Sequence, residues 1–306
     1  MSAARVPRAL VIGEALVDVT RRADGSVAEH PGGSPLNVAV TMARQGIDTT
    51  LAAHVGDDHF GALIRAHLAE SGVTLANANV SLPTASATAT IGADGSATYE
   101  FDLRWDPNEL PDPEDFHLVH VGSIGAWMAP GADAVLDLVR RAHAAGRAVG
   151  FDPNVRPALA PSVPLLRERV LELAALSRFV KLSDEDADVL AEDSGGPLSV
   201  LRLLAGHGPA LAALTRGGES ALLCSGSDEV EVRVPPVEVA DTIGAGDTWM
   251  GTLLAELLRR GWADRTSFAA DELESLGHAA VAAAAITVSR PGADPPWRDG
   301  ERPPSR

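Results

Sequence analysis

The sequence predicts an α/β protein whose core is a doubly wound, mainly parallel sheet with helices on both faces. Two observations lead to this fold class. Short apolar runs, which suit strands buried on both faces, recur along the 306 residues, and many precede a segment with helical spacing. In contrast, residues 16–29 and 86–103 alternate polar and apolar positions and have no helix after them. These two segments do not fit a parallel sheet and predict a second, smaller one.

The expected elements alternate between strand and helix from the N-terminus onwards. The run from Ala9 to Gly13 is short and apolar, which predicts a buried parallel strand. By the same criteria, further strands are expected at residues 50–55, 117–121, 147–151, 179–181 and 210–215, and helices at residues 34–46, 60–71, 133–145, 165–176, 248–260 and 279–288. No low-complexity linker or internal repeat interrupts the alternation, so we expect residues 1–306 to form one domain.

The two exceptional segments are expected to form a small antiparallel β lid inserted in that domain. Turn residues stand in the middle of each segment, at residues 23–25 and at Asp94-Gly95. One side of the sheet would be lined by small apolar side chains, namely Ala85, Ala87, Ala89 and Ile91. These cover little area for a free-standing sheet, so a partner surface would help to stabilise it.

The charge of the chain excludes two classes of partner. There are 25 Lys and Arg residues against 42 Asp and Glu residues, a net charge of -17. Neither nucleic acid nor an anionic membrane surface is therefore expected to bind. The apolar segments are too short to span a bilayer, and nothing at the N-terminus resembles a signal peptide, so we expect a soluble cytoplasmic protein. Cys224 stands in an apolar run and is interpreted as a buried structural thiol.

The segment from Asp241 to Asp247 carries the clearest functional pattern. Gly244, Ala245 and Gly246 precede an apolar helical run, where free amides at a helix N-terminus attract phosphate. Asp247 would repel a phosphate there unless it accepts a proton during a reaction. The pattern therefore predicts a phosphotransferase site with its own base. The alternative is a plain turn with an acidic residue that complements the helix dipole.

Other polar residues follow the expected strands, where ligands bind in open α/β sheets. Short side chains with donors and acceptors suit a polyhydroxylated ligand. The candidates are Asp18, Asn37, Asn154 and Arg156, and the alternative for each is a role in a turn or cap.

A second group of candidates would contact a nucleotide. Lys181 and Ser183 follow a strand and open a helix that Ser183 would cap. One of the three acids that follow, Asp184, Glu185 or Asp186, is predicted to hold Mg²⁺ through water. Thr215, Arg216 and Gly217 end another strand, and this arginine suits a phosphate group.

Taken together, these motifs resemble those of the ribokinase-like (PfkB) carbohydrate kinases over nearly the whole chain. The residues from Asp241 to Asp247 resemble the family's carboxyl-terminal signature, and Gly32, Gly33 and Asn37 resemble its amino-terminal one. The resemblance implies that Asp247 deprotonates a sugar hydroxyl and that Gly244, Ala245 and Gly246 form the anion hole. It also implies ATP, Mg²⁺ and a monovalent cation such as K⁺ near Asp241 and residues 284–292.

Within that family, residues 13–18 and 152–157 are most similar to those of fructokinases and 2-keto-3-deoxygluconate kinases. Asp18 would then bind sugar hydroxyls. Two positions depart from the pattern. Ser183 and Asp186 stand where the family usually has Asn and Glu, and Trp105 does not fit a fructokinase, although Arg104 does.

The resulting expectation is ATP-dependent phosphorylation of a hexose, fructose to fructose 6-phosphate, by a homodimer whose lids clasp each other. The alternative substrate is 2-keto-3-deoxygluconate, whose carboxylate would require Arg104 or Arg156. A non-catalytic sugar or nucleotide sensor is a different class, which Asp247 argues against. A dehydrogenase is disfavoured because residues 13–15 do not match a dinucleotide-binding glycine motif.

Overall fold

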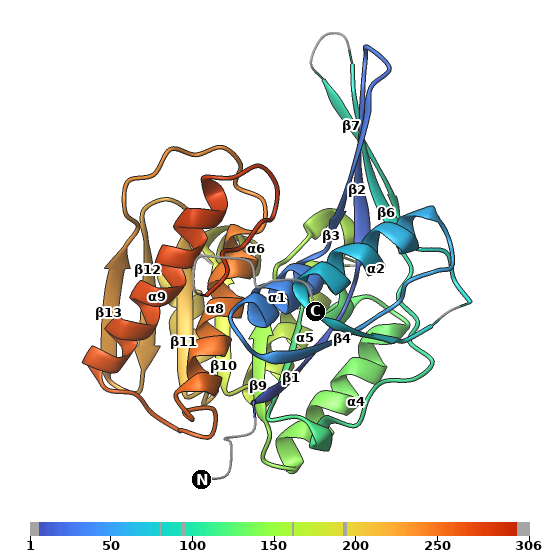
Figure 1. The fold of residues 1–306 in the computed structure, drawn as a ribbon. Helices are drawn as coiled ribbons and strands as arrows, with labels where there is room; N and C mark the ends of the chain where they lie inside the picture. The colour runs from blue at the N-terminus through green and yellow to red at the C-terminus, as the bar shows by residue number, and fades with distance from the viewer. Residues whose placement is uncertain (1–5, 80, 93–95, 161, 192–194, 299–306) are drawn as a thin grey trace.

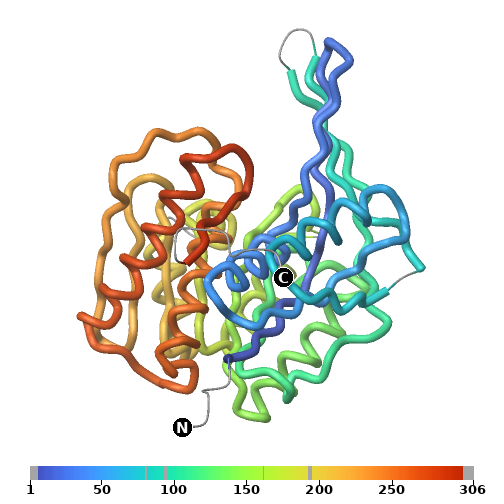
Figure 2. Tube along the Cα trace, viewed as in Figure 1, coloured from blue at the N-terminus to red at the C-terminus, as the bar shows by residue number. Residues whose placement is uncertain are grey.

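A nine-stranded sheet with helices on both faces forms the larger part of the molecule (Figures 1 and 2). The structure is a computed structural model, and it describes residues 6–79, 81–92, 96–160, 162–191 and 195–298. The strands of this sheet are β1 (Arg8–Ile12), β4 (Asp48–Ala53), β5 (Thr74–Asn77), β8 (Leu118–Gly122), β9 (Ala148–Asp152), β10 (Phe179–Ser183), β11 (Leu211–Arg216), β12 (Ser220–Ser225) and β13 (Asp228–Arg233).

The order of the strands places a switch point in the middle of the sheet. The order is β13-β12-β11-β10-β9-β8-β1-β4-β5. All pairs from β11 to β5 are parallel, and β12 and β13 are antiparallel additions at one edge. The chain builds the sheet outwards from β1 through β4, then outwards from β8 in the other direction. Ligands of such sheets bind at the carboxyl ends of the strands where the direction reverses, here between β1 and β8.

Apolar side chains cover both faces of the sheet, as a parallel sheet requires. In β1, Ala9 and Val11 belong to one buried cluster, whereas Leu10 and Ile12 belong to the other. The helices are α1 (Ser34–Arg44), α2 (His59–Ser71), α8 (Ala245–Arg259) and α9 (Ala270–Val288) with the first cluster, and α3 (Ser123–Trp127), α4 (Gly131–Ala144), α5 (Val163–Leu176), α6 (Asp184–Leu190) and α7 (Gly196–Ala205) with the second.

The predicted fold class is confirmed, and each strand and helix expected in the large sheet has a counterpart in the structure. The helix after the Asp241–Asp247 motif starts earlier than predicted, at Ala245, so its first turn contains Asp247. Hydropathy gave no sign of this start, because Gly246 is a poor helix former and the first large apolar side chain is Trp249. Among the described residues, no helix has the length and hydrophobicity that a membrane span requires.

The two exceptional segments form a separate four-stranded sheet that projects from the rest of the molecule (Figure 1). Its strands are β2 (Leu16–Arg22), β3 (Val27–Gly32), β6 (Ala85–Ile91) and β7 (Ala97–Asp102), in the order β3-β2-β6-β7. Both hairpins are antiparallel as predicted, but β2 and β6 join them through parallel pairing. Alternation of polar and apolar residues does not reveal the direction of pairing. The turn expected at Asp94-Gly95 lies outside the described residues.

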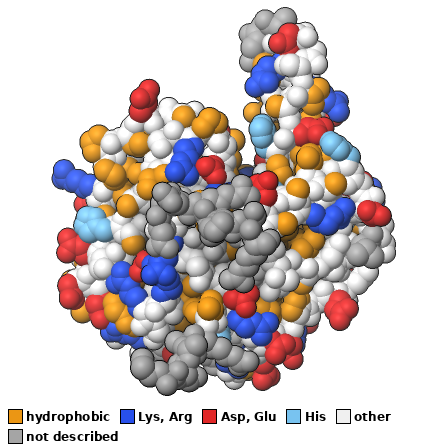
Figure 3. Space-filling model, in the orientation of Figure 1, with side chains coloured by type: hydrophobic (Ala, Val, Ile, Leu, Met, Phe, Trp, Pro, Cys, Tyr) orange, Lys and Arg blue, Asp and Glu red, His pale blue; other side chains and the backbone are white. Residues whose placement is uncertain are grey.

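The two faces of this small sheet differ in burial. Val17 and Val19 point to one face and are buried. On the other face Ala87 and Ala89 pair with Phe101 and Tyr99, so the alanines expected there do share one side. The two aromatic side chains remain 47% and 65% exposed and stack on each other with ring centroids 6.4 Å apart. Figure 3 shows this sheet as an arm that carries acidic, basic and apolar side chains.

Candidate active site

The N-termini of α1 and α8 meet at the carboxyl end of the large sheet, and both depend on glycine. Gly244 caps α8 with a left-handed φ of 76°, and a Cβ added there would lie 2.5 Å from the Cβ of Ala293. Gly33 caps α1 with a φ of 104°, and its Cβ would lie 2.7 Å from the carbonyl oxygen of Glu14. A larger residue at either position would collide with these neighbours and would also be strained by the left-handed backbone.

The first turn of α8 offers backbone donors to an anion. The amide of Ala245 donates to Thr242 and that of Thr248 to Gly244, but the amides of Gly246 and Asp247 make no hydrogen bond to another described residue. No side chain caps the helix. Unpaired amides at a helix N-terminus form an anion site, so the predicted phosphate cradle at Gly244, Ala245 and Gly246 has the required geometry.

Asp247 lies in this turn with its carboxylate held by α1. Its Oδ1 accepts a hydrogen bond from the Ser34 hydroxyl at 2.6 Å, and its Oδ2 accepts one from Nδ2 of Asn37 at 2.8 Å. The side chain is 8% exposed. Each carboxylate oxygen can accept two bonds, so both can still receive one from a ligand. A fixed carboxylate beside unpaired amides suits a general base that works on a hydroxyl next to a phosphate.

A buried ion pair lies directly beneath the cradle. Nζ of Lys181 in β10 donates to Oδ2 of Asp152 in β9 at 2.9 Å, and both side chains are almost fully buried. A Cβ on Gly246 would lie 3.0 Å from this Nζ, so the ammonium group sits against the first turn of α8. The predicted nucleotide-binding Lys181 therefore brings a positive charge to the anion site.

The carboxyl group of Asp152 is only partly compensated by the lysine. Burial raises its pKa to about 6, although Lys181 opposes this rise. Burial also disfavours the charged lysine, but the nearby carboxylates of Asp152, Asp186 and Asp247 outweigh it and raise the pKa of Lys181. Oδ1 of Asp152 has no hydrogen-bond partner among the described residues. Sequence reasoning did not select Asp152, because an Asp-Pro step after a strand is also typical of a turn.

Ser183 and Asp186 form a capping box at the start of α6. The Ser183 hydroxyl accepts from the amide of Asp186, and the amide and hydroxyl of Ser183 both donate to Oδ2 of Asp186 at 2.8 Å. Oδ1 of Asp186 accepts from the amide of Val155 at 2.6 Å. Both oxygens of Asp186 thus have protein partners, which explains the serine and aspartate at this position without invoking a metal ion.

The predicted phosphate contact at the end of β11 is less direct. Thr215 pairs with Ser183 in the sheet register, which brings it to the same edge as the cradle. The guanidinium of Arg216 forms an ion pair with Glu231 of β13. Gly217 follows in a left-handed turn with φ of 47° and has open space around it. Arg216 would have to leave Glu231 to reach a phosphate.

The sugar-binding candidates gather on the side of the small sheet. Asp18 of β2 stands opposite His30 of β3. Burial raises the pKa of Asp18, and the positive charges of His30 and Arg156 act against this rise. A Cβ on Gly32 would lie 2.3 Å from Oδ2 of Asp18, so only glycine leaves that carboxylate in place. Asp18, Gly32 and Arg156 are therefore brought together as predicted.

Two other sugar-binding candidates occupy different surroundings. Asn154 has a left-handed φ of 37°, and its carbonyl oxygen and that of Val155 accept from Arg156. Arg104 is exposed beyond the end of β7 and lies 3.8 Å from Asp102. The partner of Arg104 is thus the last residue of its own strand, β7. The next residue, Trp105, is buried.

Asp241 closes a loop against the end of α9. Its Oδ1 accepts from the amide of Ile243 and its Oδ2 from the amide of Gly292, both at 3.0 Å. The structure thus joins Asp241 to the segment at residues 284–292, the two places at which a monovalent cation was expected. Within the described residues, no three His, Cys, Asp or Glu side chains are grouped as a preformed metal site.

Glu14 contributes a further buried carboxyl group to the site, and it was not among the residues predicted from the sequence. Its Oε2 accepts from the amide of Gly125 at 3.1 Å, and Ser123 also donates to it. Burial raises the pKa of Glu14 to about 7, and the negative charge of Asp247 adds to the rise. Glu14 lies in the connection between β1 and β2 and has no ion pair among the described residues, which is unusual for a buried acid, and hydropathy gives no sign of it.

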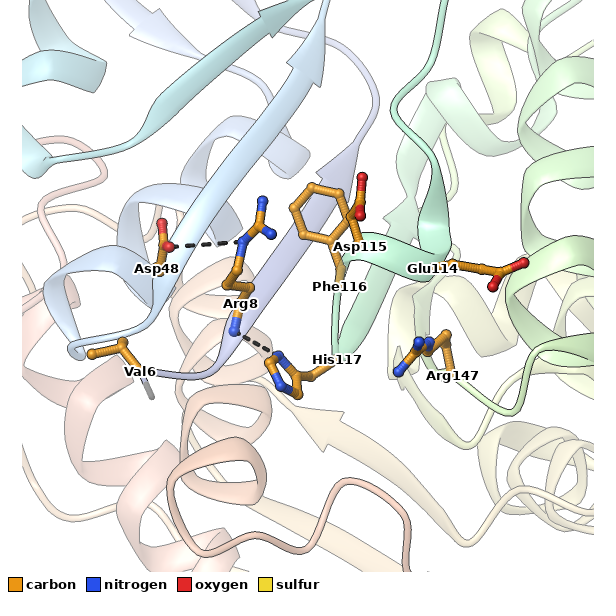
Figure 4. A pocket seen from close by; sticks show the side chains of 8 residues that line it. All are labelled: Val6, Arg8, Asp48, Glu114, Asp115, Phe116, His117 and Arg147. Atoms are coloured by element: carbon orange, nitrogen blue, oxygen red, sulfur yellow. Dashed lines mark hydrogen bonds and ion pairs between the residues drawn. The ribbon is translucent and has the colours of Figure 1, made fainter. Parts of the chain in front are cut away.

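A cavity of about 630 Å³ lies at the opposite end of the sheet (Figure 4). Arg8 at the start of β1 donates through its amide to His117, and its guanidinium lies 3.8 Å from Asp48. Arg147, which precedes β9, also lines this cavity. These are the amino ends of the parallel strands, where open α/β sheets do not bind substrates. The cavity is therefore separate from the site around Asp247.

Unpaired amides, a fixed carboxylate and a buried lysine lie together here, and phosphoryl transfer to a hydroxyl group requires groups of these kinds. The sequence profile described as "pfkB family carbohydrate kinase" matches residues 6–299. The chain belongs to this family, as the sequence motifs predicted, and the family's members are phosphotransferases that act on sugar hydroxyls.

Relatives with known names are similar over most of the chain. A fructokinase of Klebsiella pneumoniae is 32% identical over 273 residues, which cover 86% of this chain and 88% of the relative. An aminoimidazole riboside kinase of Salmonella typhimurium is 30% identical, with coverages of 91% and 88%. Among solved structures, fructokinase with bound ATP from Xylella fastidiosa superposes with a TM-score of 0.79 at 27% identity and covers 94% of this chain and 93% of its own.

Proposed function

We propose that this protein is an ATP-dependent fructokinase that transfers the γ-phosphoryl group to a hydroxyl of fructose and forms fructose 6-phosphate. One observation carries the proposal: the carboxylate of Asp247 is fixed by Ser34 and Asn37 next to the unpaired amides of Gly246 and Asp247. The similarity to fructokinases over most of the chain supports the choice of sugar.

In the proposed reaction the protein supplies positioning and charge. Asp247 accepts the proton of the sugar hydroxyl as that oxygen attacks the phosphorus. The amides at the start of α8 and the ammonium group of Lys181 stabilise the negative charge that the γ-phosphoryl oxygens carry. Because β10, α1 and α8 hold these groups, little rearrangement is needed at the moment of transfer.

We also propose that Mg²⁺ accompanies the nucleotide and that K⁺ binds near Asp241. The unpartnered, buried Oδ1 of Asp152 fits an acceptor for metal-bound water, and Asp186 adds negative charge beside it. Bound Mg²⁺ would supply positive charge to the β- and γ-phosphates. For K⁺, the loop closed by Asp241 and Gly292 offers main-chain carbonyl oxygens.

The nucleotide base has an apolar surface near the same loop. Val239, Ile243 and Ile286 are 59%, 55% and 41% exposed, which is unusual for such side chains. The amide of Ala240 donates to the carbonyl of Val288 at 2.8 Å and so joins their two segments. An adenine ring would cover these side chains, because its faces are apolar. We place the reaction in the cytoplasm, where ATP is available.

The substrate is tested by ADP release with a panel of acceptors. The panel contains fructose, glucose, ribose, 2-keto-3-deoxygluconate and aminoimidazole riboside, each with ATP and Mg²⁺. We expect fructose to have the highest kcat/KM, because Asp18 at the sugar end can accept from two hydroxyls. A clear preference for any other acceptor would refute fructose as the substrate, and no ADP release with any acceptor would refute the kinase assignment itself.

A sugar acid is the second candidate substrate. Arg156 is exposed, and among the described residues its guanidinium donates to the main-chain oxygens of Asn154 and Val155, so it can pair with a carboxylate of the substrate. A preference for 2-keto-3-deoxygluconate over fructose in the panel would favour this reading. A sugar or nucleotide sensor, in contrast, would bind a ligand without releasing ADP.

Asp18→Ala is expected to raise the KM for fructose by about ten- to a hundredfold and to leave the KM for ATP nearly unchanged. Loss of a charged hydrogen-bond partner typically costs about 1.5–3 kcal/mol. The control is Asp24→Ala, at the exposed turn between β2 and β3, where Asp24 accepts hydrogen bonds from the amide and the side chain of the neighbouring Ser26. Equal weakening of both substrates in Asp18→Ala would show that Asp18 has a structural role.

We further propose that the small sheet acts as a lid and that two lids clasp each other in a homodimer. The exposed pair of Tyr99 and Phe101 would then lie against the partner's sheet, because aromatic side chains stabilise interfaces.

Phe101→Lys is therefore expected to convert a dimer into a monomer at micromolar concentration, as measured by light scattering. Thr98→Lys adds the same charge on the same exposed strand but on the opposite face, and it should remain dimeric. A monomeric wild-type protein, or dissociation by both variants alike, would contradict the clasp.

A further inference from the structure

The hydroxyl of Ser34 donates a hydrogen bond to Asp247, as the hydroxyl of the sugar would do in the proposed reaction. Its Oγ donates to Oδ1 of Asp247 at 2.6 Å, and Asn37 fixes the other carboxylate oxygen at 2.8 Å. A hydroxyl bonded to a base that a third side chain orients is the arrangement by which enzymes activate serine as a nucleophile. The mechanism proposed for sugar phosphorylation uses the Ser34 hydroxyl to hold Asp247 but not as an acceptor of the phosphoryl group.

The position of Ser34 in the fold keeps this hydroxyl at the site. Ser34 is the first residue of α1, between the capping Gly33 and Pro35, and its side chain is buried. Asp247 lies in the first turn of α8, directly after the unpaired amide of Gly246. A Cβ on Gly244 would lie only 3.8 Å from Nδ2 of Asn37, so the first turns of the two helices are in contact. The serine hydroxyl is therefore held close to the place where the amides would bind the γ-phosphate.

We propose that Ser34 is a site of self-phosphorylation, at which the enzyme accepts the γ-phosphoryl group of its own ATP when no sugar is bound. This inference rests on the proposed kinase function. In the step, the proton of the Ser34 hydroxyl passes to Oδ1 of Asp247, and Oγ forms a bond to the γ-phosphorus. The bond from that phosphorus to the bridging oxygen breaks, and ADP leaves with its electron pair.

The product would block the site. A phosphoserine carries a charge of about −2 and would stand beside Asp247, close to the carboxylates of Glu14 and Asp152. It would also remove a donor from the base and occupy the position of the sugar's hydroxyl. We expect the modification to be at least about a hundredfold slower than sugar turnover, because Ser34 is fixed in the first turn of α1 and cannot adjust to the phosphorus as a bound sugar can, and small misplacements cost that much.

The experiment incubates the full chain with ATP and Mg²⁺ in the absence of sugar and follows its intact mass. We expect the mass of one phosphoryl group to appear, peptide mapping to place it on Ser34, and fructokinase activity to fall in parallel. Saturating fructose should suppress the modification. Ser34→Ala and Asp247→Asn should both lack it. Thr41→Val removes another buried hydroxyl of α1, whose hydrogen bond within the described residues goes to the carbonyl oxygen of Asn37, and this variant should keep the modification.

The outcomes separate this inference from the proposed function. A preparation that phosphorylates fructose but never carries phosphate on Ser34 would overturn the inference and leave the kinase assignment standing. Phosphate on Ser34 at the same rate in Asp247→Asn would also overturn it, because the base would not be involved. Failure of both fructose phosphorylation and Ser34 modification would count against the proposed function.

Discussion

Asp247→Asn is expected to lower kcat by about two to four orders of magnitude, as for the loss of a general base, while the affinity for ATP stays near that of the wild type. The substitution keeps the shape of the side chain, and the hydroxyl of Ser34 can still donate to its carbonyl oxygen. The amide group, however, cannot accept a proton from the sugar. The amides that would bind phosphate belong to the backbone of α8 and are unchanged.

The comparison that decides the role of Asp247 uses a second acid at the start of a helix. Asp271 lies in the first turn of α9 and is exposed. If Asp247 only complemented its helix dipole, Asp247→Asn and Asp271→Asn would behave alike. We expect Asp271→Asn to retain full turnover. An Asp247→Asn enzyme with more than about a tenth of the wild-type turnover at saturating sugar would contradict the assignment.

Lys181→Met is expected to lower the free energy of unfolding by about 3–5 kcal/mol near pH 8. Lys181 and Asp152 form an ion pair whose side chains are 5% and 1% exposed, and removal of one partner leaves an uncompensated buried charge. Denaturant unfolding measures the loss. A matched substitution in an exposed pair, Arg140→Met opposite Glu172, should cost less than about 1 kcal/mol.

The pH dependence of this loss gives a second check. The pKa of Asp152 is raised to about 6 in the folded protein, so the folded state takes up a proton more readily than the unfolded one. This group therefore favours folding at low pH, and that contribution is lost as the pH rises through about 6. In Lys181→Met, Asp152 is protonated near pH 5 and no longer carries an unpaired negative charge. The loss in the free energy of unfolding caused by the substitution should therefore be smaller at pH 5 than at pH 8. Adding Asp152→Asn should restore part of the stability. A cost that is equal at both pH values would mean that Asp152 carries no buried charge.

The fold could be predicted largely from hydropathy, because buried parallel strands leave a recognisable pattern. β1 is apolar on both faces, and glycines such as Gly72 end the helices in the left-handed conformation that they favour. The short strand β5 and the parallel pairing between β2 and β6 were not predicted. Both depend on contacts between segments that are distant in the sequence, and a local pattern contains no information about these.

The site was predicted where the chemistry needs an unusual residue in a motif. Asp247 after Gly-Ala-Gly stands out because an acid beside a phosphate cradle needs a reason. Ser34, Glu14 and Asp152 did not stand out, because each is also an ordinary residue for a cap, a strand end or a turn. Their importance appears only in three dimensions, where Ser34 lies 2.6 Å from a base that is 213 residues away in the sequence.

The roles of Asn37 and Asp186 illustrate the same limit from the other side. Asn37 was predicted to contact the sugar, and in the structure its amide donates to the carboxylate of Asp247. Asp186 was proposed to hold Mg²⁺ through water, and its carboxylate accepts hydrogen bonds from three donors of the protein. A motif indicates that a residue belongs to a site, but the neighbours that share its hydrogen bonds decide what it contacts.

The central claim is that the site around Asp247 moves a phosphoryl group from ATP to fructose, and phosphorus NMR of the reaction mixture tests it most directly. With the wild-type protein, we expect the γ-phosphate signal of ATP to be replaced by that of a phosphate ester on O6 of fructose, in an amount equal to the ADP formed. Asp247→Asn should leave ATP and fructose unchanged over the same time. Release of free phosphate without any sugar ester, or an ester formed equally well by Asp247→Asn, would contradict the account.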